Sequence, residues 1–199
     1  MNRRFALIAA LATLLAIASP AAAGGPPAVT VNLPGTGANR FEPSAVTINY
    51  GQYVQWTNND SVKHTSTADK FSLWNAQLSV GGGDTILFQR AGGFAYHCTI
   101  HPGMTGTVMV QMTTSDTTPN VHQLITIIFA SSGAPSGFTE QIQKRKAGGT
   151  WRLFKTSTGT SVTWTPAKAR TFELRARLKR LSDGAVSGWS PVLQLTVSP

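Results

Sequence analysis

Residues 94–108 read Phe-Ala-Tyr-His-Cys-Thr-Ile-His-Pro-Gly-Met-Thr-Gly-Thr-Val, a β-prone run interrupted by a Pro-Gly turn. Within seven residues this stretch contains a thiol at Cys98, an imidazole at His101 and a thioether at Met104. On a straight strand these side chains would point to different sides, but a strand end followed by a tight turn lets them surround one point. We therefore expect a metal site at this turn.

A second imidazole is available at His64, in a polar segment that follows the strand-like run ending at Thr57. Two imidazoles, a thiolate and a weak thioether are the ligands of blue-copper sites, because soft sulfurs favour Cu(I) while imidazoles keep Cu(II) accessible. Zinc sites are usually tetrahedral without a thioether, and iron–sulfur clusters need more cysteines. The sequence thus predicts one copper ion per chain, held by His64, Cys98, His101 and Met104.

Each ligand also has a simpler interpretation. Cys98 is the only cysteine, so it forms no internal disulfide, and the simpler interpretation is an ordinary core residue. His64 alone could be a loop histidine and Met104 alone a core side chain. Their joint occurrence with the Cys98 and His101 pair favours the metal site.

The segment 28–112 resembles a cupredoxin domain of the amicyanin and plastocyanin type. The resemblance rests on Phe41-Glu42-Pro43, Val46-Thr47-Ile48, Val54-Gln55-Trp56-Thr57-Asn58, His64 and the Cys98-x2-His101-x2-Met104 loop. It implies a Greek-key β-barrel or sandwich with His64, Cys98 and His101 as strong ligands and Met104 as the axial one. The chain departs from many relatives at Thr65, where they place an asparagine after the first histidine.

Four protein ligands leave no open position for a substrate, so we expect an electron carrier that serves redox protein partners and not an enzyme. A copper-holding or recognition module is the alternative. His97 neighbours Cys98 on the strand, so its side chain should face away from the metal, and we consider it a candidate electron exit. A two-copper, nitrite-reductase-like enzyme using His97 is a further alternative. With only four histidines in the chain, that enzyme would need ligands from another subunit.

The whole chain after the leader predicts an all-β fold in two parts. Short runs rich in Val, Ile, Thr and aromatic residues are separated by Gly, Pro and Asn. In the first part these expected strands are 29–33, 45–50, 53–58, 85–89, 93–98 and 106–111, and in the second 124–129, 138–145, 151–155, 161–164, 171–179 and 192–197.

Residues 1–23 read as a secretory signal peptide, with Arg3-Arg4, an apolar run and a small-residue cleavage region. The pattern favours general export over the twin-arginine route, although the sequence does not decide between them. We expect a periplasmic or extracellular protein with no transmembrane segment in the mature chain.

Charge divides the chain. Residues 24–115 balance four basic against four acidic residues, whereas 117–199 carry eleven basic residues against three acidic ones, a net charge of +8. The polar segment 113–120 is the expected linker, and 121–199 the expected second domain. That domain resembles a fibronectin type III module, a kind of immunoglobulin-like sandwich, through Phe138-x3-Ile142-Gln143, Gly148-Gly149-Thr150-Trp151, Phe172 to Arg177 and Ser187-Gly188-Trp189-Ser190-Pro191.

In this second domain Arg175, Arg177 and Lys179 alternate with apolar residues and predict a basic sheet face. The face has two interpretations: an arginine ladder closed by Trp189, or a surface for an acidic partner, an acidic polymer or an anionic membrane surface. Nucleic acid is not expected, because the protein is expected to be exported and no base-stacking motif is present.

Overall fold

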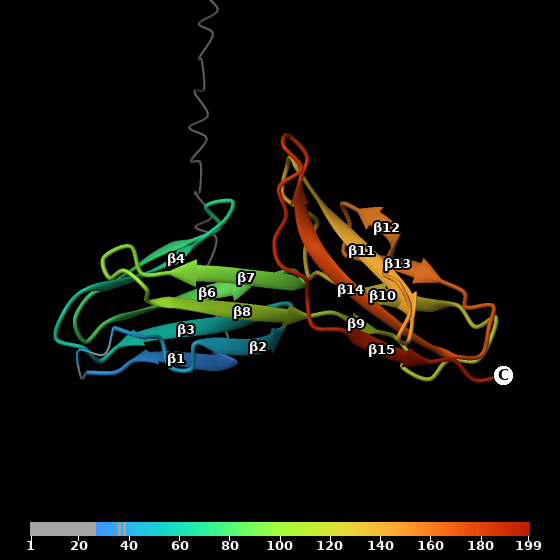
Figure 1. The fold of residues 1–199 in the computed structure, drawn as a ribbon, viewed down its shortest axis with the longest axis horizontal. Helices are drawn as coiled ribbons and strands as arrows, with labels where there is room; N and C mark the ends of the chain where they lie inside the picture. Colours follow the sequence, from blue (N-terminus) through green and yellow to red (C-terminus); the bar gives the residue numbers. More distant parts are fainter. Residues whose placement is uncertain (1–26, 36, 38) are drawn as a thin grey trace, which may run out of the picture.

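The computed structural model describes residues 27–35, 37 and 39–199, and the expected signal peptide lies outside them. The described residues form fifteen β-strands and no helix, so they contain no helix able to cross a membrane. The strands make two sandwiches side by side, with the C-terminus at the far end of the second (Figure 1). The fold is all-β, as the sequence predicts.

The first sandwich packs a three-stranded sheet against a five-stranded one. The smaller sheet has the order β1 (Val29–Leu33), β3 (Gln52–Asn58) and β6 (Gly83–Phe88). The larger has the order β2 (Ala45–Asn49), β8 (Thr105–Gln111), β7 (Gly92–His97), β4 (His64–Ala68) and β5 (Asn75–Leu78). The pairs β1/β3 and β2/β8 are parallel, and the other strand pairs in both sheets are antiparallel.

Alternation of apolar and polar residues builds the core between these sheets. Val46 and Ile48 of β2 are buried while their neighbours are exposed, and the same pattern recurs in β8. Trp56 is fully buried, and its ring packs edge-on against Tyr96 of the opposite sheet. The two rings tie β3 to β7, the strand that leads into Cys98.

Two strands of the larger sheet, β4 and β5, match none of the strands expected from the sequence. Strand β4 is almost wholly polar, yet His64, Thr65 and Ser66 are buried in it. Its polar groups have partners, since the Trp74 indole donates to Ser66 Oγ at 3.1 Å. Tertiary contacts outweigh β-propensity here, because a polar strand can be buried when its groups are hydrogen-bonded.

The second sandwich has a three-stranded and a four-stranded sheet. The first has the order β13 (Ser161–Trp164), β10 (Ile125–Ile128) and β9 (Thr113–Thr114). The second has the order β12 (Arg152–Ser157), β11 (Phe138–Lys146), β14 (Thr171–Arg180) and β15 (Leu193–Thr196). Strand β9 falls within the segment expected to be a linker and pairs with β10.

The two sandwiches meet along the start of β7. Gly93 and Gly188 exchange backbone hydrogen bonds of 2.9 and 2.8 Å, and the Ala91 amide donates to the Phe129 carbonyl at 2.7 Å. A β-carbon on Gly93 would lie 3.0 Å from the Trp189 carbonyl oxygen, so glycine permits this close approach. The strand that leads into Cys98 is therefore also a strand of the junction.

A buried ion pair crosses the same junction. The Arg90 guanidinium donates to Glu140 Oε1 at 3.2 Å and to the Gly133 carbonyl at 3.1 Å. Glu140 is fully buried, and its Oε2 has no hydrogen-bond partner among the described residues. Burial outweighs the nearby guanidinium and raises the pKa of Glu140 to about 7.

Candidate metal centre

Three potential metal ligands converge at one end of the first sandwich. Their ligand atoms, Cys98 Sγ and a ring nitrogen each of His64 and His101, all lie within 4.8 Å of one another. Nδ1 of His64 is 3.8 Å from the sulfur, and Nδ1 of His101 is 3.5 Å from it. Within the described part of the chain, this is the only cluster of three or more His, Cys, Asp or Glu side chains close enough to hold an ion.

The turn after β7 shapes this cluster. The Cys98 amide donates to the Met104 carbonyl at 2.9 Å, and the Met104 amide donates to the His101 carbonyl at 3.3 Å. Gly103 has a φ of 82°, a left-handed conformation that glycine adopts without a steric penalty. These bonds close the loop over residues 98–104 and bury the Met104 side chain beneath it.

A carboxylate orients the first imidazole. Asp60 Oδ2 accepts a hydrogen bond from His64 Nε2 at 3.2 Å, which places the ring proton on Nε2 and leaves the Nδ1 lone pair facing the sulfur. Hydrogen bonds from the Ser61 amide and then from His64 lower the pKa of Asp60, although burial opposes them. Asp60 therefore stays ionised and fixes the tautomer that a metal requires.

The sequence alone does not point to Asp60 as a functional residue. The available signal was the Asn58-Asn59-Asp60 run before His64, a composition that favours side-chain to backbone turns. In the structure, Asn58 Oδ1 accepts from the Asp60 amide at 2.9 Å, while its Nδ2 donates to the carbonyls of Val62 and Leu78. Asn58 thus holds the loop that carries Asp60.

Thr65 links the two ligand segments. Its amide donates to Cys98 Sγ at 3.3 Å, and its hydroxyl accepts from the Thr99 amide at 2.9 Å. The hydroxyl also lies 3.1 Å from Thr99 Oγ1. At the position where many relatives have asparagine, this hydroxyl joins the His64 strand to the Cys98 loop.

The donor set fits copper better than the common alternatives. His64, Cys98 and Met104 are almost completely buried, with exposed fractions of 1%, 4% and 1%, and His101 is the partly exposed member. A buried thiol beside two free imidazole nitrogens, with a thioether on the same loop, combines soft and intermediate donors. An amide aimed at the sulfur stabilises a thiolate, the form in which cysteine binds metals.

Comparisons with known proteins agree with this chemistry. The family described as copper binding proteins, plastocyanin/azurin family, matches residues 28–111. Plastocyanin of Scenedesmus fuscus is 36% identical over 97 residues, which cover 42% of this chain and 99% of that protein. This chain belongs to the plastocyanin/azurin family of copper-binding proteins. The match assigns the first sandwich to the family and does not extend over the second.

Other similar proteins also match about two-fifths of this chain. Chloroplastic plastocyanin of Tetradesmus obliquus is 37% identical over 89 residues, which cover 38% of this chain and 61% of that protein. A solved structure of a purple cupredoxin from Nitrosopumilus maritimus has 30% identity and a TM-score of 0.39, covering 42% of this chain and 99% of that one. Amicyanin from Paracoccus versutus has 28% identity and a TM-score of 0.37, with coverage of 42% and 80%.

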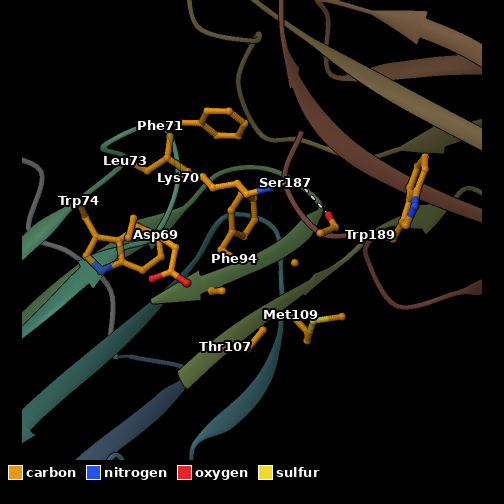
Figure 2. Close-up of a pocket in the computed structure, with 14 residues that line it drawn as sticks. Asp69, Lys70, Phe71, Leu73, Trp74, Phe94, Thr107, Met109, Ser187 and Trp189 are labelled. Atoms are coloured by element: carbon orange, nitrogen blue, oxygen red, sulfur yellow. Dashed lines mark hydrogen bonds between the residues drawn. The ribbon is translucent and has the colours of Figure 1, made fainter. Parts of the chain in front are cut away.

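His97 lies outside the ligand cluster. Its Nδ1 hydrogen-bonds the Asp69 carboxylate at 2.7 Å, and both side chains are about two-fifths exposed. Asp69 lines a pocket of about 410 Å³ between the outer face of β7 and β8 and the segment 187–189 (Figure 2). Trp74 and Phe94 lie on the first-domain side of this pocket and Trp189 on the other. His97 is therefore not one of the converging ligands, and its ring is held by Asp69.

The basic face of β14 forms a stacked ladder. Arg175 lies 4.2 Å from the Trp151 ring centre and 4.3 Å from that of Trp189, while Arg177 lies 4.1 Å from Trp189. Arg145 also lies 4.3 Å from the Trp151 ring centre. The expected stacking of Trp189 among the guanidinium groups is therefore confirmed.

Proposed function

We propose that this chain is an exported blue copper protein that holds one copper ion through His64, Cys98, His101 and Met104 and transfers single electrons between redox partners. The observation that carries the proposal is the convergence of one thiol and two imidazole nitrogens within 4.8 Å. Its membership of the plastocyanin/azurin family supports the same assignment.

Copper, when bound, supplies the one-electron chemistry, and the protein supplies a rigid and largely water-free cage. Asp60 and the Thr65 amide fix the His64 ring and the sulfur, so both keep their positions during a change of charge. Burial of Met104 and Cys98 excludes water from the site. A cage that does not need to rearrange is suited to electron transfer, because reorganisation raises the barrier.

The partner would dock over His101, the one partly exposed ligand. Ile100 is 50% exposed beside it, and Val62, on the loop before His64, is 44% exposed. These side chains and the Pro102-Gly103 turn form an apolar surface for a redox protein. His97, on the other face and bonded to Asp69, is proposed as a second electron exit.

Two other functions remain as alternatives. A copper-holding or recognition module would bind copper without exchanging electrons. A two-copper enzyme would need a second centre, but His97 and His122 lie outside the one ligand cluster found among the described residues. We favour the carrier because the plastocyanin relatives are similar over 99% of one relative's length.

The test is repeated reduction and reoxidation of the copper-loaded full chain by small redox reagents and by a partner cupredoxin oxidant. The carrier should take up and return one electron per chain over many cycles. Ile100→Asp should slow exchange with the protein oxidant, and the control Leu124→Asp, at a 66% exposed site in the second domain, should not. Tight Cu(I) binding without exchange would favour the holding module, and two coppers with turnover of nitrite or oxygen would favour the enzyme.

The second domain, which we propose to be fibronectin type III-like, would steer the carrier toward an acidic polymer or an anionic surface. Its net charge of +8 supports this role. Arg175, Arg177 and Lys179 were the residues expected to contact that partner.

A further inference from the structure

The cations best placed to bind an anion are not those of the arginine ladder on β14. Arg175 donates through Nε and Nη2 to Gln143 Oε1, at 3.0 and 2.7 Å, and Arg177 donates through Nε to Gln141 Oε1 at 3.0 Å. Tryptophan rings cover the faces of both guanidinium groups. Three N–H groups of these two arginines are thus already bonded within the sheet.

A second group of cations surrounds a pocket at the β11–β12 hairpin. The pocket has a volume of about 510 Å³, and its lining includes Lys144, Lys146 and Arg152. Among the described residues, none of these three forms an ion pair with a carboxylate. The three acidic residues of this domain pair instead with Arg90, Arg145 and Arg180.

Lys144 occupies an unusual position for an ammonium group. It shares a face of β11 with the fully buried Ile142, and its Nζ lies 4.1 Å from the Phe154 ring centre and 3.9 Å from that of Trp164. Phe154 reaches it because a β-bulge leaves that residue without an opposite partner on β11. Desolvation by these rings lowers the pKa of Lys144 to about 8.

A second cation lies directly across the strand pair from this ammonium. Arg152 is the register partner of Lys144, and like charges opposite each other destabilise a sheet. Lys146, two residues along β11, adds a third positive charge at the same pocket. An oxyanion placed between the three would offset their mutual repulsion and give Lys144 the counter-charge that it lacks.

We propose that this pocket binds a phosphate ester, with the phosphate between Lys144, Lys146 and Arg152 and the organic part against Leu153 and Phe154. The apolar part of the pocket argues for an organic phosphate over the bare ion, since Leu153 is 59% exposed beside the cations. The site uses no residue of the copper centre. Binding at this pocket would name the class of anionic partner proposed for the second domain. It does not depend on electron transfer at the copper centre.

The test is calorimetric titration of the full chain with phenyl phosphate, inorganic phosphate and citrate, with and without copper. Phenyl phosphate should bind saturably and more tightly than inorganic phosphate or citrate, with the same affinity in both copper states. The double variant Lys146→Ala/Arg152→Ala should weaken it about tenfold or more, as expected for loss of charge-assisted bonds. The control Lys155→Ala/Lys168→Ala removes the same charge at exposed positions outside the pocket and should change affinity less than about twofold.

Three results would overturn the proposal. They are no saturable binding of phenyl phosphate, equal losses in the two double variants, and citrate binding as tight as that of phenyl phosphate. The part of the tryptophan fluorescence that is lost in Trp164→Phe gives an independent signal, because the Trp164 ring contacts Lys144, and it should change on binding in the wild type. Circular dichroism of each variant should match the wild type, because Lys146 and Arg152 are exposed side chains.

Discussion

The two sandwiches enclose polar groups in opposite ways. At the metal centre, a cysteine sulfur and two imidazoles converge, and a buried carboxylate, Asp60, orients one of the imidazoles. At the β11–β12 hairpin, the cations Lys144, Lys146 and Arg152 gather without a carboxylate partner among the described residues. The first arrangement suits a cation and the second suits an anion, so the charge of the supporting groups distinguishes two sites with similar apolar surroundings.

The largest effect should come from removing the sulfur. Cys98→Ser replaces a soft thiolate by a hydroxyl that binds copper poorly, so copper affinity and any intense visible absorption should be lost. The apo protein should keep its fold, because serine is close to cysteine in size. Absorption spectra and copper titrations measure the change, and a variant that kept the wild-type spectrum would show that Cys98 is not a ligand.

A smaller effect should come from the ion pair between the two regions. The pKa of Glu140 is raised to about 7 in the folded state from 4.5, so the folded protein binds more protons between these values. Stability should therefore fall as pH rises from about 4.5 to 7, by roughly 3 kcal/mol, and stay low above that range. Glu140→Gln should abolish this part of the slope.

Urea unfolding at pH 4.5, 5.5 and 7.5 tests this expectation, with the difference between wild type and variant as the readout. An identical slope in the two proteins would mean that the carboxyl group titrates normally. The copper spectrum of Glu140→Gln should be unchanged, because Glu140 lies in the second sandwich and not among the ligand residues.

A still smaller effect should come from removing the Thr65 hydroxyl, which links the two ligand segments. Thr65→Val keeps the shape of the side chain and the amide bond to the sulfur but removes the acceptor for the Thr99 amide. Loss of that bond should lower the free energy of unfolding by about 2 kcal/mol. Chemical denaturation measures it, and Thr47→Val, at an exposed position of β2, is the control. An equal or larger loss in the control would argue against a special role for Thr65.

The smallest effect should come from the ladder of the second sandwich. Trp151→Leu removes the ring that both Arg145 and Arg175 contact and should cost about 1 kcal/mol, while leaving copper binding intact. Thermal unfolding monitored by circular dichroism measures the loss. A change in copper affinity would contradict the separation of the two regions.

Much of this architecture was predictable from local sequence. The alternating runs indicated both sandwiches, and β1 and β13 begin and end at the expected residues. The Pro-Gly turn after Cys98 indicated a ligand loop because its residues lie close together in sequence. The expected stacking on Trp189 followed from the alternation along β14.

What could not be predicted depends on contacts between distant residues. Strand β4 is polar, and only its hydrogen bonds to the Cys98 loop and to Trp74 explain its burial. The role of Asp60 becomes visible only when His64 is seen to face the sulfur. Likewise the engagement of Arg175 with Gln143 on the neighbouring strand, which weakens it as a partner contact, requires the register of β11 and β14.

The most direct test of the central proposal is the visible and electron paramagnetic spectrum of the copper-loaded protein together with a copper count. We predict one copper per chain, an intense blue absorption band and narrow copper hyperfine splitting, all lost in Cys98→Ser. A colourless Cu(II) protein with wide hyperfine splitting, or two coppers per chain, would contradict it.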